Sequence, residues 1–236
     1  MVEFSLSPDI SLKNVDCMEF MSTLKDNAFD LAITDPPYFE GPNKPNFYRN
    51  GKFSSTHAPA GDYDPLVNWD VPSEDYFKEL KRVSKNQIIW GANHFASKFD
   101  SSGPGWIVWD KDNGNSSFAD AELAYSSFEK AVRVFKFRWN GMLQGYGGNK
   151  RKNETRIHST QKPVALYEWI LSKYADKGSK ILDTHFGSGS IAIACHRMGF
   201  SLTATEIDGV MCRKASERFA NETAQMRLVL DGSEVA

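Results

Sequence analysis

The apolar positions of the chain form short strand-like runs that alternate with segments of helical spacing. Apolar runs bounded by polar or turn residues predict five buried strands, at 29–34, 87–90, 106–109, 180–182 and 202–205. Helical patterns are predicted after Ser73, which can act as an N-cap, and over 163–174, 190–198 and 210–221. This alternation predicts an α/β fold with a doubly wound, mostly parallel sheet.

Two segments depart from the alternation. Residues 39–69 are rich in Pro, Gly, Asn and Ser and are too long for an ordinary connection, so we expect either a mobile, functional loop or a disordered segment there. Residues 128–138 alternate between apolar and basic positions and predict an antiparallel strand, followed by a glycine-rich turn at 141–148. We therefore expect one domain over 1–236, with a small β insertion at about 111–157.

Composition limits the class of protein. No run reaches the roughly 18 apolar residues of a membrane helix, and residues 1–10 lack the features of a secretory signal, so a cytoplasmic protein is expected. The three cysteines have no C-x-x-C spacing, which indicates reduced thiols rather than disulfides or a zinc site. No residue spacing suggests a metal site, and the sequence leaves open whether two copies form a homodimer.

Basic residues gather in one part of an otherwise acidic chain. The formal net charge is −2, yet residues 130–162 hold nine basic residues and a single acidic one. Such a stripe fits contact with a phosphate backbone, and it fits a solvated hairpin equally well. In the loop at 39–69, further basic residues are interleaved with aromatic ones, which suits contact with nucleic acid. The candidate DNA-binding residues are Lys44, Arg49, Lys52, Arg133, Lys136, Arg138, Lys150, Arg151 and Lys152.

The first motif with chemical content is Asp35-Pro36-Pro37-Tyr38, directly after a predicted strand. Ligands bind at the carboxyl ends of strands in open α/β sheets. Two prolines stiffen the turn and remove two backbone donors, so it presents only acceptors: the Asp35 carboxylate and backbone carbonyls. Such acceptors could hold the two hydrogens of an exocyclic amine and stabilise the positive charge that develops when the amine is alkylated. A plain strand-terminating turn is the alternative.

The second motif is a strand, a tight glycine turn and a helix. Its candidate ligand-binding residues are Asp183, His185, Phe186, Gly187, Ser188, Gly189 and Ser190. Glycines let the backbone approach a ligand at a helix N-terminus. Glu206 ends the next predicted strand, where a carboxylate can bind both hydroxyls of a ribose. These features do not by themselves distinguish S-adenosylmethionine from NAD.

With both motifs in this order, the chain resembles the DNA amino-methyltransferases of the permuted, β-type order. His158-Ser159-Thr160-Gln161-Lys162-Pro163 resembles the H-x-T-Q-K-P segment of that family. Trp90-Gly91-Ala92-Asn93 resembles its W-G-x-N strand and turn near the substrate pocket. Asp16-Cys17 resembles its G-D-x segment near the cofactor adenine, with Val15 in place of Gly.

The resemblance implies a permuted Rossmann-like class I methyltransferase fold with S-adenosylmethionine as cofactor and DNA as partner. It implies catalytic roles for Asp35, Pro36, Pro37 and Tyr38. It adds Asp16, Cys17 and Lys162 to the cofactor-binding residues. Many family members have D-P-F-x-G-S-G, whereas Thr184 and His185 replace Pro and Phe here. Either His185 or Phe186 could therefore take the place of the aromatic ring beside the methionine moiety.

The sequence favours N6 of adenine in DNA as the methyl acceptor. N4 of cytosine is the nearest alternative, because D-P-P-Y leans to adenine but the pocket for either base is similar. An RNA or protein-glutamine methyltransferase would carry the motifs in the opposite order. An NAD-dependent oxidoreductase would explain Gly187 and Glu206 but not the Asp35 motif. A DNA-binding module without activity would not need an intact acceptor turn.

Overall fold

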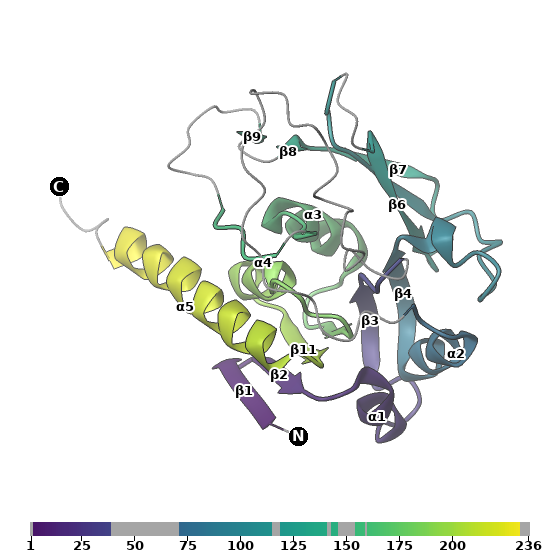
Figure 1. The fold of residues 1–236 in the computed structure, drawn as a ribbon, viewed down its shortest axis with the longest axis horizontal. Helices are drawn as coiled ribbons and strands as arrows, with labels where there is room; N and C mark the ends of the chain where they lie inside the picture. Colours follow the sequence, from purple (N-terminus) through teal and green to yellow (C-terminus); the bar gives the residue numbers. More distant parts are fainter. Residues whose placement is uncertain are drawn as a thin grey trace, which may run out of the picture.

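The computed structural model describes residues 2–38, 71–114, 119–140, 143–145, 154–158 and 160–231. Within these residues nine strands form one sheet, in the order β1-β2-β11-β10-β3-β4-β6-β5-β7 (Figure 1). Their bounds are β1 Val2–Ser7, β2 Ile10–Asn14, β3 Phe29–Thr34, β4 Ser84–Trp90, β5 Trp106–Asp110, β6 Ala121–Ser126, β7 Arg133–Lys136, β10 Lys180–Asp183 and β11 Ser201–Glu206. A separate antiparallel pair joins β8, Trp139–Asn140, to β9, Leu143–Gln144.

The centre of the sheet is parallel. Strands β2, β11, β10, β3 and β4 pair in parallel, while β1 and β6 add antiparallel strands at either side of this block. All five strands predicted from the apolar pattern are present, each within three residues of its expected start. Because β3 and β10 are parallel neighbours, their carboxyl ends lie at one edge of the sheet, and the two chemical motifs follow those ends.

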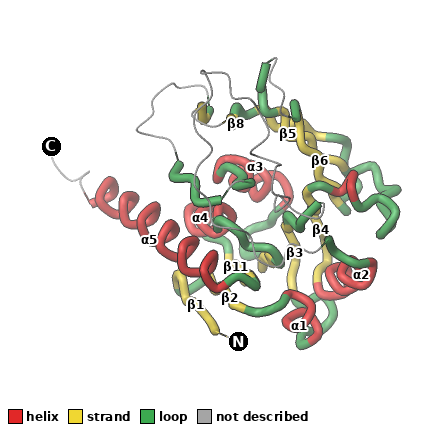
Figure 2. Tube along the Cα trace, viewed as in Figure 1, coloured by secondary structure: helices red, strands yellow, loops and turns green. Residues whose placement is uncertain are grey.

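Helices cover both faces of the sheet, as Figure 2 shows. On one face lie α3, Val164–Tyr174, α4, Ser190–Met198, and α5, Gly209–Asp231; on the other lie α1, Cys17–Ser22, and α2, Glu74–Val83. A single 3-10 turn, η1, spans Ala92–His94. The doubly wound, mostly parallel fold expected from the sequence is confirmed by this arrangement.

Local chemistry sets the helix ends. The Ser73 hydroxyl accepts from the backbone N–H of Tyr76, which confirms the predicted N-cap of α2. Gly199 ends α4 in the left-handed conformation, with φ of 72°. Pro163 is the residue before α3 rather than its first turn. The last helix, α5, extends ten residues beyond the expected end at 221.

The strand predicted over 128–138 is shorter and oriented differently. It is β7, and it pairs in parallel with β5 instead of antiparallel with a neighbour. The chain does reverse direction after β6, but both edges of β6 already pair, with β4 and β5, so β7 joins the free edge of β5. The faces are also inverted: Val132 and Val134 are 54% and 60% exposed, while Phe135 packs against the core.

The rest of the region at 111–157 contributes β6 and the β8–β9 pair, so part of it extends the main sheet. The loop expected at 39–69 lies outside the described residues. None of the helices in the described part of the chain combines the length and apolar character that crossing a bilayer requires.

Candidate active site

Asp35 is the first residue after β3, and its carboxylate has a donor on each oxygen. The Tyr38 hydroxyl donates to Oδ1, and the Lys162 ammonium donates to Oδ2. The intervening prolines, Pro36 and Pro37, stiffen the short turn that brings the Tyr38 hydroxyl back to the Asp35 carboxylate. The Asp35 side chain keeps 20% of its surface exposed, so a ligand can reach it.

The Tyr38 ring is held on two sides. It stacks on His94 of η1 at 5.2 Å between ring centroids, with 10° between planes, and meets Phe95 edge-on at 6.1 Å. Gly91 lies directly against it, with φ of +67°, and a Cβ atom at this position would lie 2.0 Å from Tyr38 Cε1. The glycine of the Trp90-Gly91 pair is therefore required by both its backbone conformation and the ring beside it.

The glycine turn connects β10 to α4. Gly187 donates its backbone N–H to Glu206 Oε2 at 2.9 Å, and Asp208 donates to Glu206 Oε1 at 3.0 Å. Glu206 therefore ties the turn to the end of β11, where the sequence predicted a ribose-binding carboxylate. Each of its oxygens keeps a second lone pair that a ligand hydroxyl can use.

Phe186 and His185 occupy different places. The Phe186 ring is 4% exposed and lies under Gly189, whose added Cβ would approach it to 2.9 Å. His185 instead faces the carboxyl end of β3. Of the two residues that could replace the missing family aromatic, Phe186 therefore supports the turn from below, and His185 lies between the two motifs.

A buried hydroxyl cluster joins the two motifs. Thr34 Oγ1, at the end of β3, lies 2.7 Å from Thr184 Oγ1 and 3.0 Å from the Tyr76 hydroxyl. His185 Nδ1 lies 3.0 Å from Thr184 Oγ1 and 3.3 Å from Thr34 Oγ1. The acceptor turn at Asp35 and the glycine turn thus begin side by side at one edge of the sheet.

Burial raises the pKa of three carboxyl groups at this edge. The pKa of Asp183 rises to about 8, because burial outweighs the hydrogen bond from the His185 backbone. The pKa values of Asp35 and Glu206 are also raised by burial. A cation bound at this edge would favour the ionised carboxylates, so the site suits a positively charged ligand.

Asp16 and Cys17 stand at the start of α1. Asp16 Oδ1 caps the helix by accepting from the backbone N–H groups of Met18 and Glu19, at 2.8 and 3.0 Å. Burial, assisted by the Asp16 charge, raises the pKa of Cys17 to about 12, so this thiol is a weak nucleophile. Ser190 Oγ donates to the Lys162 carbonyl at 2.7 Å and Ser188 is buried beside it, so both serines support the segment that carries Lys162.

Lys162 lies where the sequence did not expect it. It was assigned to the cofactor, but its ammonium contacts Asp35, the Tyr38 hydroxyl at 3.0 Å and Glu122 Oε2 at 3.1 Å. Glu122, on β6, and Lys111, which pairs with it, were missed altogether. A carboxylate in a strand of mostly apolar residues was the available signal, although it also suits a solvent-facing position.

The predicted DNA-binding residues are only partly described. Arg133 and Lys136 lie on the edge strand β7, and Arg138 follows it. Asp112 neutralises part of this charge, since it lies 3.0 Å from Lys136 Nζ and 2.7 Å from an Arg138 nitrogen. The stripe is therefore less basic in space than in sequence. Lys44, Arg49, Lys52, Lys150, Arg151 and Lys152 lie outside the described residues.

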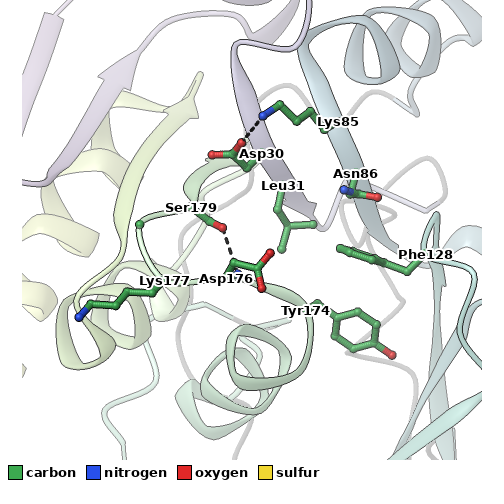
Figure 3. Close-up of a pocket in the computed structure, with 10 residues that line it drawn as sticks. Asp30, Leu31, Lys85, Asn86, Phe128, Tyr174, Asp176, Lys177 and Ser179 are labelled. Carbon is green, nitrogen blue, oxygen red and sulfur yellow. Dashed lines mark hydrogen bonds and ion pairs between the residues drawn. The ribbon is translucent and has the colours of Figure 1, made fainter.

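A cavity, shown in Figure 3, lies at the ends of β3 and β4 that are opposite to the Asp35 turn. It has a volume of about 340 Å³ and is bordered by the Asp30–Lys85 ion pair and the rings of Phe128 and Tyr174. Asp30 is at the start of β3 and Asp35 follows its end, so this cavity is separate from the candidate active site.

Comparison with known proteins relates the second half of the chain to DNA methylases. Residues 110–217 match the family described as DNA methylase, of the N6/N4 type. The type II methyltransferase M.HinfI of Haemophilus influenzae is 24% identical over 218 residues, which are 78% of this chain and 61% of that enzyme. The chain therefore spans less than two thirds of that relative.

Two solved structures share the fold. The complex of M1.HpyAVI with SAM aligns with a TM-score of 0.54 and 21% identity, covering 89% of this chain and 99% of that one. The cytosine-N4-specific PvuII DNA methyltransferase aligns with a TM-score of 0.55 and 10% identity, covering 96% and 94%. At these identities the structures establish a common fold and not a common substrate.

We predict that Gly91→Ala destabilises the protein more than Gly178→Ala does. Both glycines have positive φ, but nothing lies within 4 Å of a Cβ at Gly178, whereas a Cβ at Gly91 would overlap Tyr38. Gly178→Ala should lower the free energy of unfolding by about 1 kcal/mol, and Gly91→Ala by roughly 1–3 kcal/mol more, as measured by urea denaturation. Equal losses would show that the Tyr38 ring moves aside freely.

We also predict that His185→Phe weakens the loss of stability in acid. Burial lowers the pKa of His185 to about 4, from 6.5 for the free side chain, so the unfolded chain binds more protons between these values. Stability from this group is complete above pH 6.5 and decreases as the pH falls toward 4. The loss between pH 7 and pH 5 should be about 2 kcal/mol smaller in the variant, by urea denaturation at both values. The same replacement at exposed His196 controls for removal of a histidine. If His185→Phe loses as much stability between pH 7 and pH 5 as the unmodified protein, the lowered pKa of His185 is contradicted.

Proposed function

We propose that the chain, which matches the N6/N4 DNA methylase family over residues 110–217, transfers a methyl group from S-adenosylmethionine to an exocyclic amine of a base in DNA. One observation carries the proposal. The acceptor turn at Asp35 and the glycine turn after β10 follow adjacent parallel strands. Thr34, the last residue of β3, lies 2.7 Å from Thr184, the first residue after β10, measured between their hydroxyl oxygens. A methyl donor held at one turn is therefore next to an amine held at the other.

The described residues suit S-adenosylmethionine. Asp183 is a carboxylate that burial destabilises, and a cationic group of the cofactor would offset that penalty, while Glu206 would accept hydrogen bonds from the ribose hydroxyls. The backbone around Gly187 leaves room, because only the His185 carbonyl, at 4.0 Å, would be near an added Cβ. We assign Asp183, His185, Gly187 and Glu206 to the cofactor, with Phe186, Gly189 and the serines supporting the turn. The cofactor would supply an electrophilic methyl group. The SAM complex of a protein with the same fold supports this choice.

The Asp35 turn would prepare the amine. An exocyclic amine is a poor nucleophile because its lone pair is delocalised into the ring. The Asp35 carboxylate and the Pro36 carbonyl would accept its two hydrogens, which favours the pyramidal form and stabilises the positive charge that develops on nitrogen. The Tyr38 ring, which stacks on His94, would give the base an aromatic surface to contact once the base leaves the duplex.

DNA would approach along the edge that carries β7. Arg133, Lys136 and Arg138 are the described basic residues on that side, and Asp112 offsets part of their charge. We therefore propose that they orient the duplex by contact with phosphates rather than bind it strongly by themselves. An NAD-dependent oxidoreductase is disfavoured, because it leaves the Asp35 turn without a role and does not fit the family.

We predict that Asp35→Ala abolishes methyl transfer while leaving cofactor binding nearly unchanged. Loss of an acceptor aimed at developing charge should lower kcat by at least about 100-fold. Transfer of labelled methyl groups to DNA measures kcat, and calorimetric titration with S-adenosylmethionine measures the Kd. The matched control is Asp75→Ala, which removes an exposed carboxylate of α2. Full activity in Asp35→Ala would remove the proposed role of this residue.

We further predict that the methylated base is adenine, at N6. The aspartate of the D-P-P-Y turn favours adenine, whereas the cytosine-N4-specific PvuII enzyme shows that the same fold also serves cytosine. Mass spectrometry of nucleosides from DNA treated with the protein distinguishes N6-methyl-2′-deoxyadenosine from N4-methyl-2′-deoxycytidine. Finding only the cytosine product would keep the proposed reaction and overturn its base.

A further inference from the structure

A chain of alternating charges runs beneath the acceptor turn. Its members come from four separate segments: Asp35 after β3, Lys162 before α3, Glu122 on β6 and Lys111 after β5. Lys162 forms ion pairs with both Asp35 and Glu122, and Lys111 forms an ion pair with the other oxygen of Glu122. Asp35 is the only member that belongs to the acceptor turn itself, so the fold brings the other three to that turn.

Lys162 is fixed in place at the centre of this chain. Its side chain is 4% exposed, and its ammonium lies 5.5 Å from the centre of the Tyr38 ring and 5.4 Å from that of Trp90. Glu122 Oε2 is 3.1 Å from Lys162 Nζ, but the two are not aligned as a hydrogen bond. Their contact therefore acts chiefly through charge.

Glu122 stays ionised in this setting. Burial opposes its charge, but Lys162 and Lys111 outweigh burial and lower the pKa of Glu122 to about 2. One ammonium, that of Lys162, is thus shared between two carboxylates. Asp35 is consequently less fully neutralised than it would be in a private ion pair, and the Glu122 charge acts to raise its pKa.

On the proposed function, we propose that Glu122 is a positioning residue for methyl transfer, which shares Lys162 with Asp35 and so keeps Lys162 from fully compensating the charge of the ionised Asp35 carboxylate. A carboxylate fully neutralised by its own lysine would stabilise a developing cation poorly. With Glu122 present, Lys162 still orients Asp35 through Oδ2. The Lys162 charge is also partly compensated by Glu122 on β6. Lys111 limits the effect by neutralising Glu122 from the other side.

Other ionisable groups around Asp35 act on it in known directions. Tyr38 donates a hydrogen bond to it, and the pKa of this phenol is raised by burial and by the Asp35 charge. Asp183 on β10 and Tyr167 on α3 are both close enough for the Asp35 charge to raise their pKa values. None of these residues contacts Glu122 through a described hydrogen bond, so changes at Glu122 should reach Asp35 through the Glu122 charge itself and through the shared Lys162 ammonium.

The test compares two variants that alter the charge in opposite senses. In Glu122→Gln, Lys162 forms an ion pair with Asp35 alone. The kcat should therefore fall about tenfold, and the acid limb of the pH profile of kcat should move down by roughly one pH unit. Lys111→Met leaves Glu122 uncompensated, so the acid limb should move up. KM for DNA and for the cofactor should stay within about twofold in both, since neither residue contacts Asp183 or Glu206.

A control and a second measurement complete the design. Glu3→Gln removes the carboxylate of a similar cross-strand ion pair, with Lys13 at 2.9 Å, far from the site, and should leave the profile unchanged. Carbon-13 NMR of aspartate carboxyl groups, assigned with Asp35→Asn, follows the titration of Asp35 without requiring activity. It also reports the Asp35 charge state in a variant that folds but has lost activity.

The outcomes separate the two proposals. If the unmodified chain transfers no methyl group to DNA, the proposed function fails, while the NMR titration still tests the link between Glu122 and Asp35. Opposite shifts of the Asp35 titration in Glu122→Gln and Lys111→Met support the inference. Shifts in the same direction, or none in either variant, overturn it and leave Glu122 as a purely structural residue.

Discussion

The ion pair between Asp35 and Lys162 is the interaction on which the site depends. A carboxylate at the end of a buried strand is penalised by lost hydration, and this raises its pKa. The Lys162 ammonium, itself almost fully buried, offsets that penalty and fixes the orientation of the carboxylate. The residues before α3 therefore do more than lead into a helix, because they carry the counter-charge of a residue 127 positions away in the chain.

The same region couples the two halves of the site. Ser190, the first residue of α4, donates a hydrogen bond to the carbonyl of Lys162, which ties the glycine turn to the lysine segment. Arg218 of α5 binds Ser190 and the Ser188 carbonyl and forms an ion pair with Glu154. Side chains of α4 and α5 thus connect the glycine turn to the segment that carries Lys162. Such cross-connection favours a preorganised site, in which little rearrangement is needed when a substrate arrives.

Sequence patterns predicted where strands and helices lie better than they predicted which strands pair and which side chains meet. Strands such as 29–34 and helices such as 190–198 were predictable because buried strands and amphipathic helices impose local periodicity. The pairing of β7 was predicted wrongly, because the choice of edge depends on which strands are already paired. The resemblance assigned Lys162 to the cofactor, and the structure places its ammonium beside Asp35 and Glu122. A motif shows where the chain turns but not what its side chain contacts.

The sequence by itself determined the chemistry of the two motifs. Two prolines after an aspartate make a stiff acceptor turn in any fold, and glycines before a helix leave its N-terminus open. Only the tertiary structure decided that these turns adjoin, and that Glu122 and Lys111 complete the charge around Asp35. The physical reason is the range of each effect. Backbone stiffness acts over neighbouring residues, whereas burial and Coulomb interaction depend on distance in space. The order of the strands in the sheet determines which distant segments come close together.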